Sequence, residues 1–297
     1  MHVFVTGATG LIGRALCAEL LRAGHRVTAL SRSAAASLPA GVTPLRGDPA
    51  AAGPWQEALR GCDACVNLAG EPLAGRRWSA ERKRRIRESR LFSAARVAEA
   101  VAAGGPGVLV QGSAVGFYGD RGDEELTERS PAGEGFLAEL CAAWEEAAAP
   151  AAARARVVLL RTGIVLAREG GALPQMALPF RLFAGGPIGG GAFWQPWIHL
   201  ADELGLILWA LGEGRVGGPL DATAPAPLRN RELAAALGEA LHRPAVLPTP
   251  ALAVRLALGE MAEVVTASQR VLPAKALALG YRFRFPEAAP ALHDLLR

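Results

Sequence analysis

Cysteine is scarce in this chain, and long apolar runs are missing from it. Four cysteines are too few for a disulfide framework in 297 residues. Cys62 and Cys65 form a C-x-x-C pair, but no second pair completes a zinc site, so we expect two buried thiols and no metal. No apolar run reaches the roughly 18 residues that span a bilayer, and the sequence opens on an expected strand rather than a basic leader. We therefore expect a cytoplasmic protein with no membrane partner.

The chain also has only a small excess of positive charge, with a formal net charge of +4. Basic side chains do gather in residues 76–90. Helical spacing places Ile86, Arg90 and Val97 on one face and leaves Arg84 outside, which is typical of a solvated helix surface. We therefore expect no nucleic-acid partner, and nucleic-acid binding is a distant third hypothesis. Arg90 points toward the apolar side and needs a partner, which a cofactor phosphate or ribose would supply.

Glycine is abundant, and three glycines mark a phosphate-binding turn. Gly7, Gly10 and Gly13 follow an expected strand and open an amphipathic helix. Glycine lets the backbone approach a pyrophosphate, whose charge then meets the N–H groups and the positive dipole end of the helix. The G-x-x-G-x-x-G spacing resembles that of extended short-chain dehydrogenase/reductases. The residues predicted to bind the cofactor here and after the fourth expected strand are Gly7, Thr9, Gly10, Leu11, Ile12, Gly13, Leu68, Ala69 and Gly70.

The end of the second expected strand predicts which nicotinamide cofactor is used. An NAD site places an acidic residue there to accept hydrogen bonds from the ribose hydroxyls, but this chain has Ser31 and Arg32. A guanidinium binds a 2′-phosphate through two hydrogen bonds, and a neighbouring hydroxyl donates to it. We therefore predict NADP(H). Asp48, after the third strand, is the expected acceptor for the adenine amino group.

The first half of the chain alternates expected strands with helices. Because the strands are apolar throughout, both faces of a parallel sheet must be covered. This pattern predicts a Rossmann-type, doubly wound α/β fold that binds ligands at the carboxyl ends of its strands. The expected strands are residues 2–6, 26–30, 42–46, 64–69, 107–113 and 156–161, and the clearest helices are residues 11–24, 79–102 and 135–149.

The alternation stops at residues 170–197, which are rich in glycine, proline and aromatic side chains. A helix at 200–212 and a strand at 218–223 indicate that the chain then returns to the first domain. Helices near 229–242 and 250–260 follow. We therefore predict an NADP-binding domain at 1–166 plus about 198–223, and a smaller α+β substrate lobe at about 167–197 plus 224–297.

Several longer motifs resemble those of one family across almost the whole chain. They are VNLAGEPLAGRRW (66–78), SR (89–90), GSAVGFYG (112–119), FLAELCAAWEEAA (136–148), LRTGIVL (160–166), QPWIHLAD (195–202) and LPAKALALGYRFRFP (272–286). Together they resemble the epimerase-like family of atypical extended short-chain dehydrogenase/reductases, which carries a C-terminal domain of unknown function, here about 249–296. The resemblance implies an NADP-type cofactor and a substrate cleft between the Rossmann domain and the C-terminal lobe.

The catalytic pair of short-chain dehydrogenases is missing. Those enzymes use Tyr-x-x-x-Lys on the helix after strand five, where the lysine lowers the pKa of the tyrosine. The residues four positions after Tyr118 and Tyr281, the two tyrosines of the chain, are Gly122 and Phe285. By position in the pattern, Phe136 and Leu140 stand where the tyrosine and the lysine would be. Neither side chain can transfer a proton.

Other groups could replace the pair as catalytic residues. Ser113 matches the serine or threonine at the end of strand five and could hydrogen-bond a substrate oxygen. Glu71, after strand four, would have a raised pKa if it were desolvated there, although a structural role is equally consistent with its position. Tyr118 is a further candidate, with capping of its loop as the alternative.

The predicted substrate-binding residues are Gln195, Trp197 and His199. For His199, a hydrogen-bonded packing role at the start of a helix is favoured over catalysis. Phe193, Trp194 and Trp197 could stack on a flat ligand or close the core between the lobes. The favoured function is an NADP(H)-dependent oxidoreductase or epimerase that acts on a small polar or nucleotide-linked substrate. The alternative is a non-catalytic NADP(H)-binding module, and a homodimer is left open.

Overall fold

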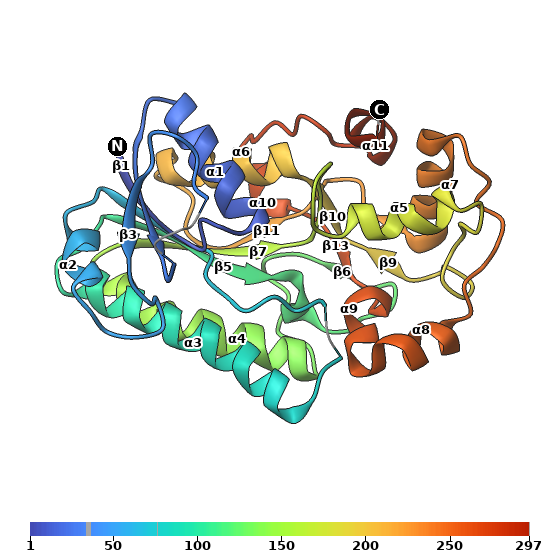
Figure 1. Cartoon of the computed structure of the whole chain (residues 1–297), viewed down its shortest axis with the longest axis horizontal. Helices are drawn as coiled ribbons and strands as arrows, with labels where there is room; N and C mark the ends of the chain where they lie inside the picture. Colours follow the sequence, from blue (N-terminus) through green and yellow to red (C-terminus); the bar gives the residue numbers. More distant parts are fainter. Residues whose placement is uncertain (34–36, 76, 297) are drawn as a thin grey trace.

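The computed structural model describes residues 1–33, 37–75 and 77–296. Within these residues, seven parallel strands form one sheet in the order β3-β2-β1-β4-β5-β7-β11 (Figure 1). The chain starts in the middle of the sheet and extends it in both directions, which confirms the predicted doubly wound fold. The strands are β1 (His2–Thr6), β2 (Arg26–Ser31), β3 (Thr43–Arg46), β4 (Ala64–Asn67), β5 (Val108–Ala114), β7 (Arg156–Thr162) and β11 (Gly218–Ala222).

Helices cover both faces of this sheet (Figure 1). On one face, α1 (Leu11–Arg22) packs against α6 (Leu200–Gly212), and their apolar side chains form the largest core with strand residues. On the other face, α3 (Ala80–Ala102) packs against α4 (Phe136–Ala148), and α2 (Trp55–Arg60) packs against α3. The continuous apolar strands of the sequence are explained by this burial on both sides.

A buried polar cluster fixes the carboxyl ends of the three central strands. Asn67 at the end of β4 donates from Nδ2 to Gln111 Oε1 on β5 at 2.8 Å. Its Oδ1 accepts from the hydroxyls of Thr6 on β1 and Ser93 on α3. These side chains are all buried, and each finds a partner in the cluster. The edge at which a doubly wound sheet binds ligands is therefore held rigidly.

The rest of the chain forms a smaller lobe beyond the carboxyl ends of the strands (Figure 1). Its core joins α5 (Leu173–Arg181), α7 (Asn230–Leu241) and α11 (Ala288–Leu296). Shorter helices of this lobe are α8 (Ala251–Leu258) and α9 (Glu263–Thr266), whereas α10 (Ala274–Ala278) packs against β11 and places Ala276 in the largest core. Three strand pairs lie outside the large sheet: β8 (Ile164–Leu166) with β10 (Trp197–His199), β9 (Trp194–Gln195) with β12 (Leu228–Arg229), and β6 (Glu125–Leu126) with β13 (Arg270–Val271).

Strand β4 and helix α5 differ from the sequence-based expectation. Strand β4 ends at Asn67 rather than at residue 69, because Leu68 turns beneath Gly7. A Cβ on Gly7 would lie 2.5 Å from the Leu68 carbonyl oxygen, so this crossing needs a glycine. Helix α5 was not predicted, since the segment is rich in helix-breaking residues. Its Pro174 lies in the first turn, where proline is tolerated, while Pro179 lies inside the helix.

Glu203 on α6 is a wholly buried carboxyl group behind the end of β7. Its Oε1 accepts from the Thr162 hydroxyl at 2.8 Å, and its Oε2 has no partner among the described residues. Burial raises the pKa of Glu203 from 4.5 to about 8. The folded state therefore binds this proton more tightly than the unfolded state. Stability is lost as the pH rises from about 4.5 to about 8, because only the unfolded chain can then release the proton freely.

We expect Glu203→Gln to stabilise the protein at pH 8, where it removes the ionisation penalty, and to destabilise it modestly near pH 4.5, where only its unpaired buried amide N–H counts. The gain is roughly 2 kcal/mol, because removal of the ionisation penalty is offset in part by an unpaired buried amide N–H. Urea unfolding at the two pH values measures the difference. Glu239→Gln, an exposed change, is the control. A stability difference between Glu203→Gln and the wild type that does not depend on pH would contradict this account.

Candidate functional site

The turn between β1 and α1 presents backbone N–H groups to solvent. Gly10 precedes the helix in an extended conformation, and within the described chain no side chain caps the first helical turn. Thr9 and Gly10 are exposed, while Leu11 and Ile12 are half-buried. An exposed helix N-terminus of this kind carries donors and a positive dipole end, and both attract an anion.

The three glycines of this turn have different tasks. Gly7 has a φ of +68°, which side chains disfavour, and it lies against the end of β4. Gly13 brings α1 close to β1, because a Cβ there would lie 2.2 Å from the Gly7 carbonyl oxygen. A Cβ on Gly10 would meet only that same oxygen, at 3.3 Å. Gly7 and Gly13 therefore serve the fold, while Gly10 is the glycine whose missing side chain leaves the turn open.

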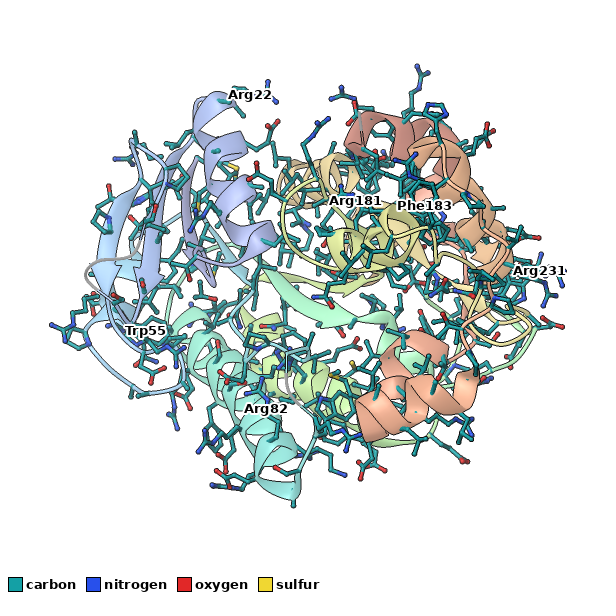
Figure 2. The ribbon with its side chains drawn as sticks, turned by 45° about the vertical axis from the view of Figure 1, so that its right-hand side comes forward. Arg22, Trp55, Arg82, Arg181, Phe183 and Arg231 are labelled. Atoms are coloured by element: carbon teal, nitrogen blue, oxygen red, sulfur yellow. The ribbon has the colours of Figure 1, made fainter. Side chains whose placement is uncertain are left out.

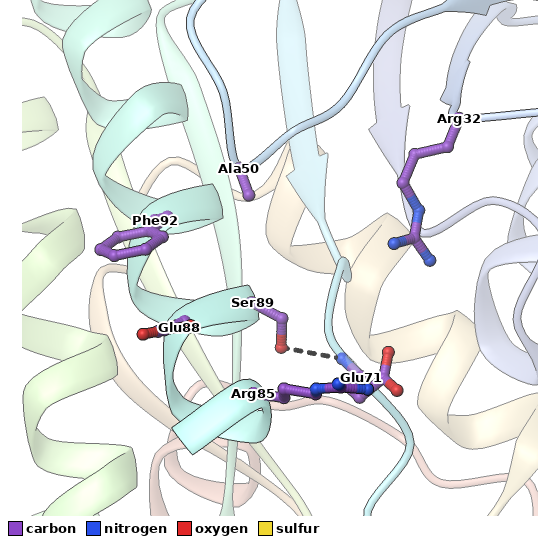
Figure 3. A pocket seen from close by; sticks show the side chains of 7 residues that line it. All are labelled: Arg32, Ala50, Glu71, Arg85, Glu88, Ser89 and Phe92. Atoms are coloured by element: carbon purple, nitrogen blue, oxygen red, sulfur yellow. Dashed lines mark hydrogen bonds between the residues drawn. The ribbon is translucent and has the colours of Figure 1, made fainter. Parts of the chain in front are cut away.

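Beside this turn, a cavity of about 390 Å³ lies between the ends of β2 and β4 and the first half of α3 (Figure 3). Arg32 enters it from the residue after β2, and Glu71 from the loop after β4. Arg85 and Ser89 line it from α3. Ser31 is the last residue of β2 and is half-buried. Asp48 lies outside this lining and is exposed, and its Oδ1 accepts from the Ala50 N–H at 3.0 Å.

Glu71 is held at this cavity by two contacts with α3. Its carboxylate forms an ion pair with Arg82 at 2.6 Å, and its backbone N–H donates to Ser89 Oγ at 3.0 Å (Figure 3). Arg82 lies in the first turn of α3 (Figure 2). The Glu71 side chain is 31% exposed and paired with a cation. This pairing favours the structural alternative for Glu71, and its proton-transfer role stays a prediction.

The loop after β4 carries the remaining predicted cofactor residues. Leu68 is half-buried, Ala69 is buried with its N–H donating to the Thr6 hydroxyl, and Gly70 is exposed. A Cβ on Gly70 would lie 3.1 Å from the guanidinium carbon of Arg90. Arg90 itself donates to the carbonyl oxygens of Glu71 and Ile86 and lies over the Trp144 ring. The protein thus supplies the partner that Arg90 requires, and its contact with a cofactor stays a prediction.

The carboxyl ends of β5 and β7 hold a buried ion pair that the sequence analysis missed. Glu145 of α4 accepts two hydrogen bonds from Arg161 of β7, each 2.8 Å long. Ser113 of β5 donates its hydroxyl proton to Glu145 Oε1 at 2.7 Å. All three side chains are less than a tenth exposed. Arg161 also lies 3.5 Å from the centroid of the Phe117 ring.

Tyr118 is wholly buried beside this pair. Its hydroxyl lies 2.8 Å from Asp221 Oδ1 and 3.0 Å from the Thr127 carbonyl oxygen, and it accepts from Arg161. Burial, followed by the nearby Asp221, raises the pKa of Tyr118. Burial and the nearby Glu128 raise the pKa of Asp221 well above its usual range. A catalytic tyrosine needs a lowered pKa, so these contacts support the structural alternative for Tyr118.

The positions expected for a tyrosine and a lysine lie in an apolar cluster. Phe136 begins α4, and its ring packs edge-on against Trp78 with 5.2 Å between centroids. Leu140 is buried in the same cluster, which also includes Ile86 and Leu137. The first turns of α4 therefore offer packing rather than proton transfer.

The three predicted substrate-binding residues are buried where β9 and β10 meet the smaller lobe. Trp197 is fully buried, and its Nε1 donates to the Ala226 carbonyl oxygen. Gln195 Oε1 accepts from Asn230 Nδ2 at 3.0 Å. His199 Nδ1 accepts from the Ala201 N–H and caps α6, and burial lowers the pKa of its ring. These contacts match the packing alternative for His199, and none of the three side chains faces an open surface.

The basic stretch at the start of α3 is largely paired. Arg84 bonds to Glu81 and Glu88, Arg82 to Glu71, and Lys83 to Glu260 of the smaller lobe. Ile86, Ser93, Val97 and Val101 form the buried face, as the helical spacing predicts. Arg76, the first residue of the stretch, lies outside the described residues. Arg84 and Arg85 are exposed pairs on the helix surface, whereas Arg82 and Lys83 are half-buried in their pairs.

The four cysteines are buried and unpaired, as predicted for Cys62 and Cys65. Within residues 1–33, 37–75 and 77–296, no group of three or more His, Cys, Asp or Glu side chains could hold a metal ion. The same ranges contain no helix that is both long enough and apolar enough to cross a membrane.

This strand order, with an uncapped glycine turn after the first strand, defines a dinucleotide-binding protein of the Rossmann class. The chain belongs to the NAD dependent epimerase/dehydratase family, whose profile matches residues 3–221. A second profile, described as a domain of unknown function (DUF1731), matches residues 249–295. Both matches confirm the predicted family.

Relatives that match this chain over its whole length support this assignment. The epimerase family protein SDR39U1 homolog, chloroplastic, of Arabidopsis thaliana is 40% identical over 100% of this chain and 87% of its own. The crystal structure of human epimerase family protein SDR39U1 (isoform 2) with NADPH superposes with a TM-score of 0.88 at 36% identity, covering 100% of this chain and 99% of that one. A nucleoside-diphosphate sugar epimerase from Corynebacterium glutamicum reaches 0.79 at 37% identity, covering 100% and 58%.

Proposed function

We propose that this protein binds NADP(H) and acts as an oxidoreductase or epimerase on a small polar or nucleotide-linked substrate. The observation that carries the proposal is the open turn at Gly10, followed by an uncapped helix and flanked by the Arg32 cavity. NADPH in the structure of the human relative supports the cofactor. The reaction proceeds without a Tyr-x-x-x-Lys pair.

The residues present fit a dinucleotide phosphate. The first-turn N–H groups of α1 would hold the pyrophosphate, since no side chain in the described chain competes for them. Arg32 and Ser31 would bind the 2′-phosphate, and Asp48 would accept from the adenine amino group. When bound, the nicotinamide would accept or supply hydride. Residues 1–166 plus about 198–223 would form the cofactor domain, and 167–197 plus 224–297 the substrate lobe.

Arg32 supplies the test of cofactor choice. We expect NADPH to bind at least tenfold more tightly than NADH, a difference of about 1.4 kcal/mol that one charge-assisted phosphate contact can supply. Arg32→Ala should narrow this ratio by weakening NADPH binding alone. Fluorescence titration of both cofactors measures the ratio. Arg22→Ala, at the far end of α1 (Figure 2), is the matched control. Equal affinities of the wild type for NADPH and NADH would reject the proposal.

A non-catalytic NADP(H)-binding module is the second candidate. Phe136 and Leu140 pack in an apolar cluster where other members of the class transfer a proton, and this favours it. The two functions differ in one observable, the redox state of the bound cofactor after incubation with a metabolite pool. An oxidoreductase changes that state, whereas a binding module leaves it unchanged while NADPH still binds.

A further inference from the structure

We propose that Ser113 and Glu145 form the proton relay of this protein, in place of a tyrosine and lysine. The inference rests on the proposed function, because a relay needs a hydride-transfer partner. Ser113 ends β5 at the carboxyl edge of the sheet, where a doubly wound fold places its ligands. Glu145 lies on the same helix as Phe136 and Leu140, further toward its C-terminus.

The direction of the Ser113 hydrogen bond indicates the direction of proton transfer. Its only hydroxyl proton is donated to Glu145 Oε1 at 2.7 Å, so its lone pairs are left for another donor. A substrate hydroxyl is such a donor. Ser113 is therefore set to accept a proton from an alcohol while it passes its own proton to Glu145.

Glu145 is held in place to receive that proton. Arg161 bonds to both of its carboxylate oxygens, an arrangement that fixes the carboxylate plane. The titratable and charged groups that face Glu145 are Arg161 from β7, Asp221 from β11 and Cys141 on its own helix.

The proton balance of the relay is simple. In alcohol oxidation, the O–H bond of the substrate breaks and its proton moves to Ser113 Oγ, while the Ser113 proton moves to Glu145 Oε1. The carbinol C–H bond breaks as a C=O bond forms, and the oxidised nicotinamide cofactor of the proposed function takes the hydride. Reduction of a carbonyl runs the same path backwards. The substrate class that this relay serves is an alcohol and its carbonyl product.

The relay is tested first without cofactor, by labelling the apoprotein with phenylmethanesulfonyl fluoride. Proton transfer from Ser113 to Glu145 lets Oγ form a bond to sulfur while the S–F bond breaks. Peptide mass mapping should find the label on Ser113 in the wild type and in Glu146→Gln, an exposed neighbouring change. Labelling should slow at least 100-fold in Glu145→Gln. No label on wild-type Ser113, or an unchanged rate in Glu145→Gln, would overturn the relay.

A second arm follows the oxidation of NADPH by phenanthrenequinone. Ser113→Ala and Glu145→Gln should lower turnover by roughly two to four orders of magnitude and flatten its pH profile, with NADPH affinity within about twofold of the wild type. Ser113→Ala keeps the Glu145–Arg161 pair, so it tests the relay even if Glu145→Gln folds poorly. Failure of the wild type to bind NADPH would instead reject the proposed function. A wild type that binds NADPH without reducing the quinone, or variants with unchanged rates, would overturn the relay.

Discussion

Gly10→Val is expected to lower NADPH affinity at least 100-fold, about 2.7 kcal/mol, while the apoprotein stays folded. Gly10 has a φ of −75°, which valine adopts without strain, and a Cβ there meets only the Gly7 carbonyl oxygen, at 3.3 Å. The two added methyl groups would instead occupy the space in front of the first-turn N–H groups, where the pyrophosphate must approach. Fluorescence titration with NADPH and thermal unfolding of the apoprotein measure the two effects.

Gly13→Val is the matched comparison within the same turn. A Cβ at Gly13 would lie 2.2 Å from the Gly7 carbonyl oxygen and 2.9 Å from the Ala8 Cα, so α1 could not pack on β1. This variant should lose the fold together with cofactor binding. Undiminished NADPH affinity in Gly10→Val would remove the turn from the binding site.

Arg161→Met is expected to destabilise the protein by about 3–5 kcal/mol, because it leaves Glu145 buried and charged without its partner. The Tyr118 hydroxyl loses a donor at the same time. Combining Arg161→Met with Glu145→Leu should restore part of the stability, since two well-packed apolar side chains replace an isolated charge. Urea unfolding of the single and double variants gives the comparison.

The exposed Arg84–Glu81 pair is the control for this experiment. Arg84 is 60% exposed, and Arg84→Met should change stability by less than about 0.5 kcal/mol. Equal effects of Arg84→Met and Arg161→Met would contradict the assigned importance of the buried pair. A double variant less stable than Arg161→Met alone would show that the unpaired Glu145 is not the cause of the destabilisation.

Much of the fold follows from local patterns in the sequence. The central strands are continuous apolar runs, and their order in the sheet follows from the βαβ alternation. The end of β4 could not be predicted, because it depends on Leu68 crossing beneath Gly7, which is 61 positions earlier in the sequence. Helix α5 could not be predicted because it contains Pro174 and Pro179. Proline is tolerated in the first turn of a helix, and the sequence alone does not show where that turn begins.

The candidate site also has a part that the sequence predicts and a part that it does not. The turn at Gly10 and the Arg32 position follow from motif spacing, whereas the partners of Glu71 depend on tertiary contacts with α3. The Glu145–Arg161 pair joins a helix to a strand, and propensity does not reveal it. A signal was present nonetheless. Glu145 shares the apolar face of α4 with Leu137, Cys141 and Ala148, and a carboxylate at such a position needs a buried partner.

A crystal structure of the protein with NADP⁺ tests the central claim most directly. The account predicts the pyrophosphate on the first-turn N–H groups of α1, the 2′-phosphate within hydrogen-bond distance of Arg32, and the nicotinamide ring beside Ser113. A dinucleotide bound away from the Gly10 turn, or a 2′-phosphate that contacts neither Arg32 nor Ser31, would contradict it.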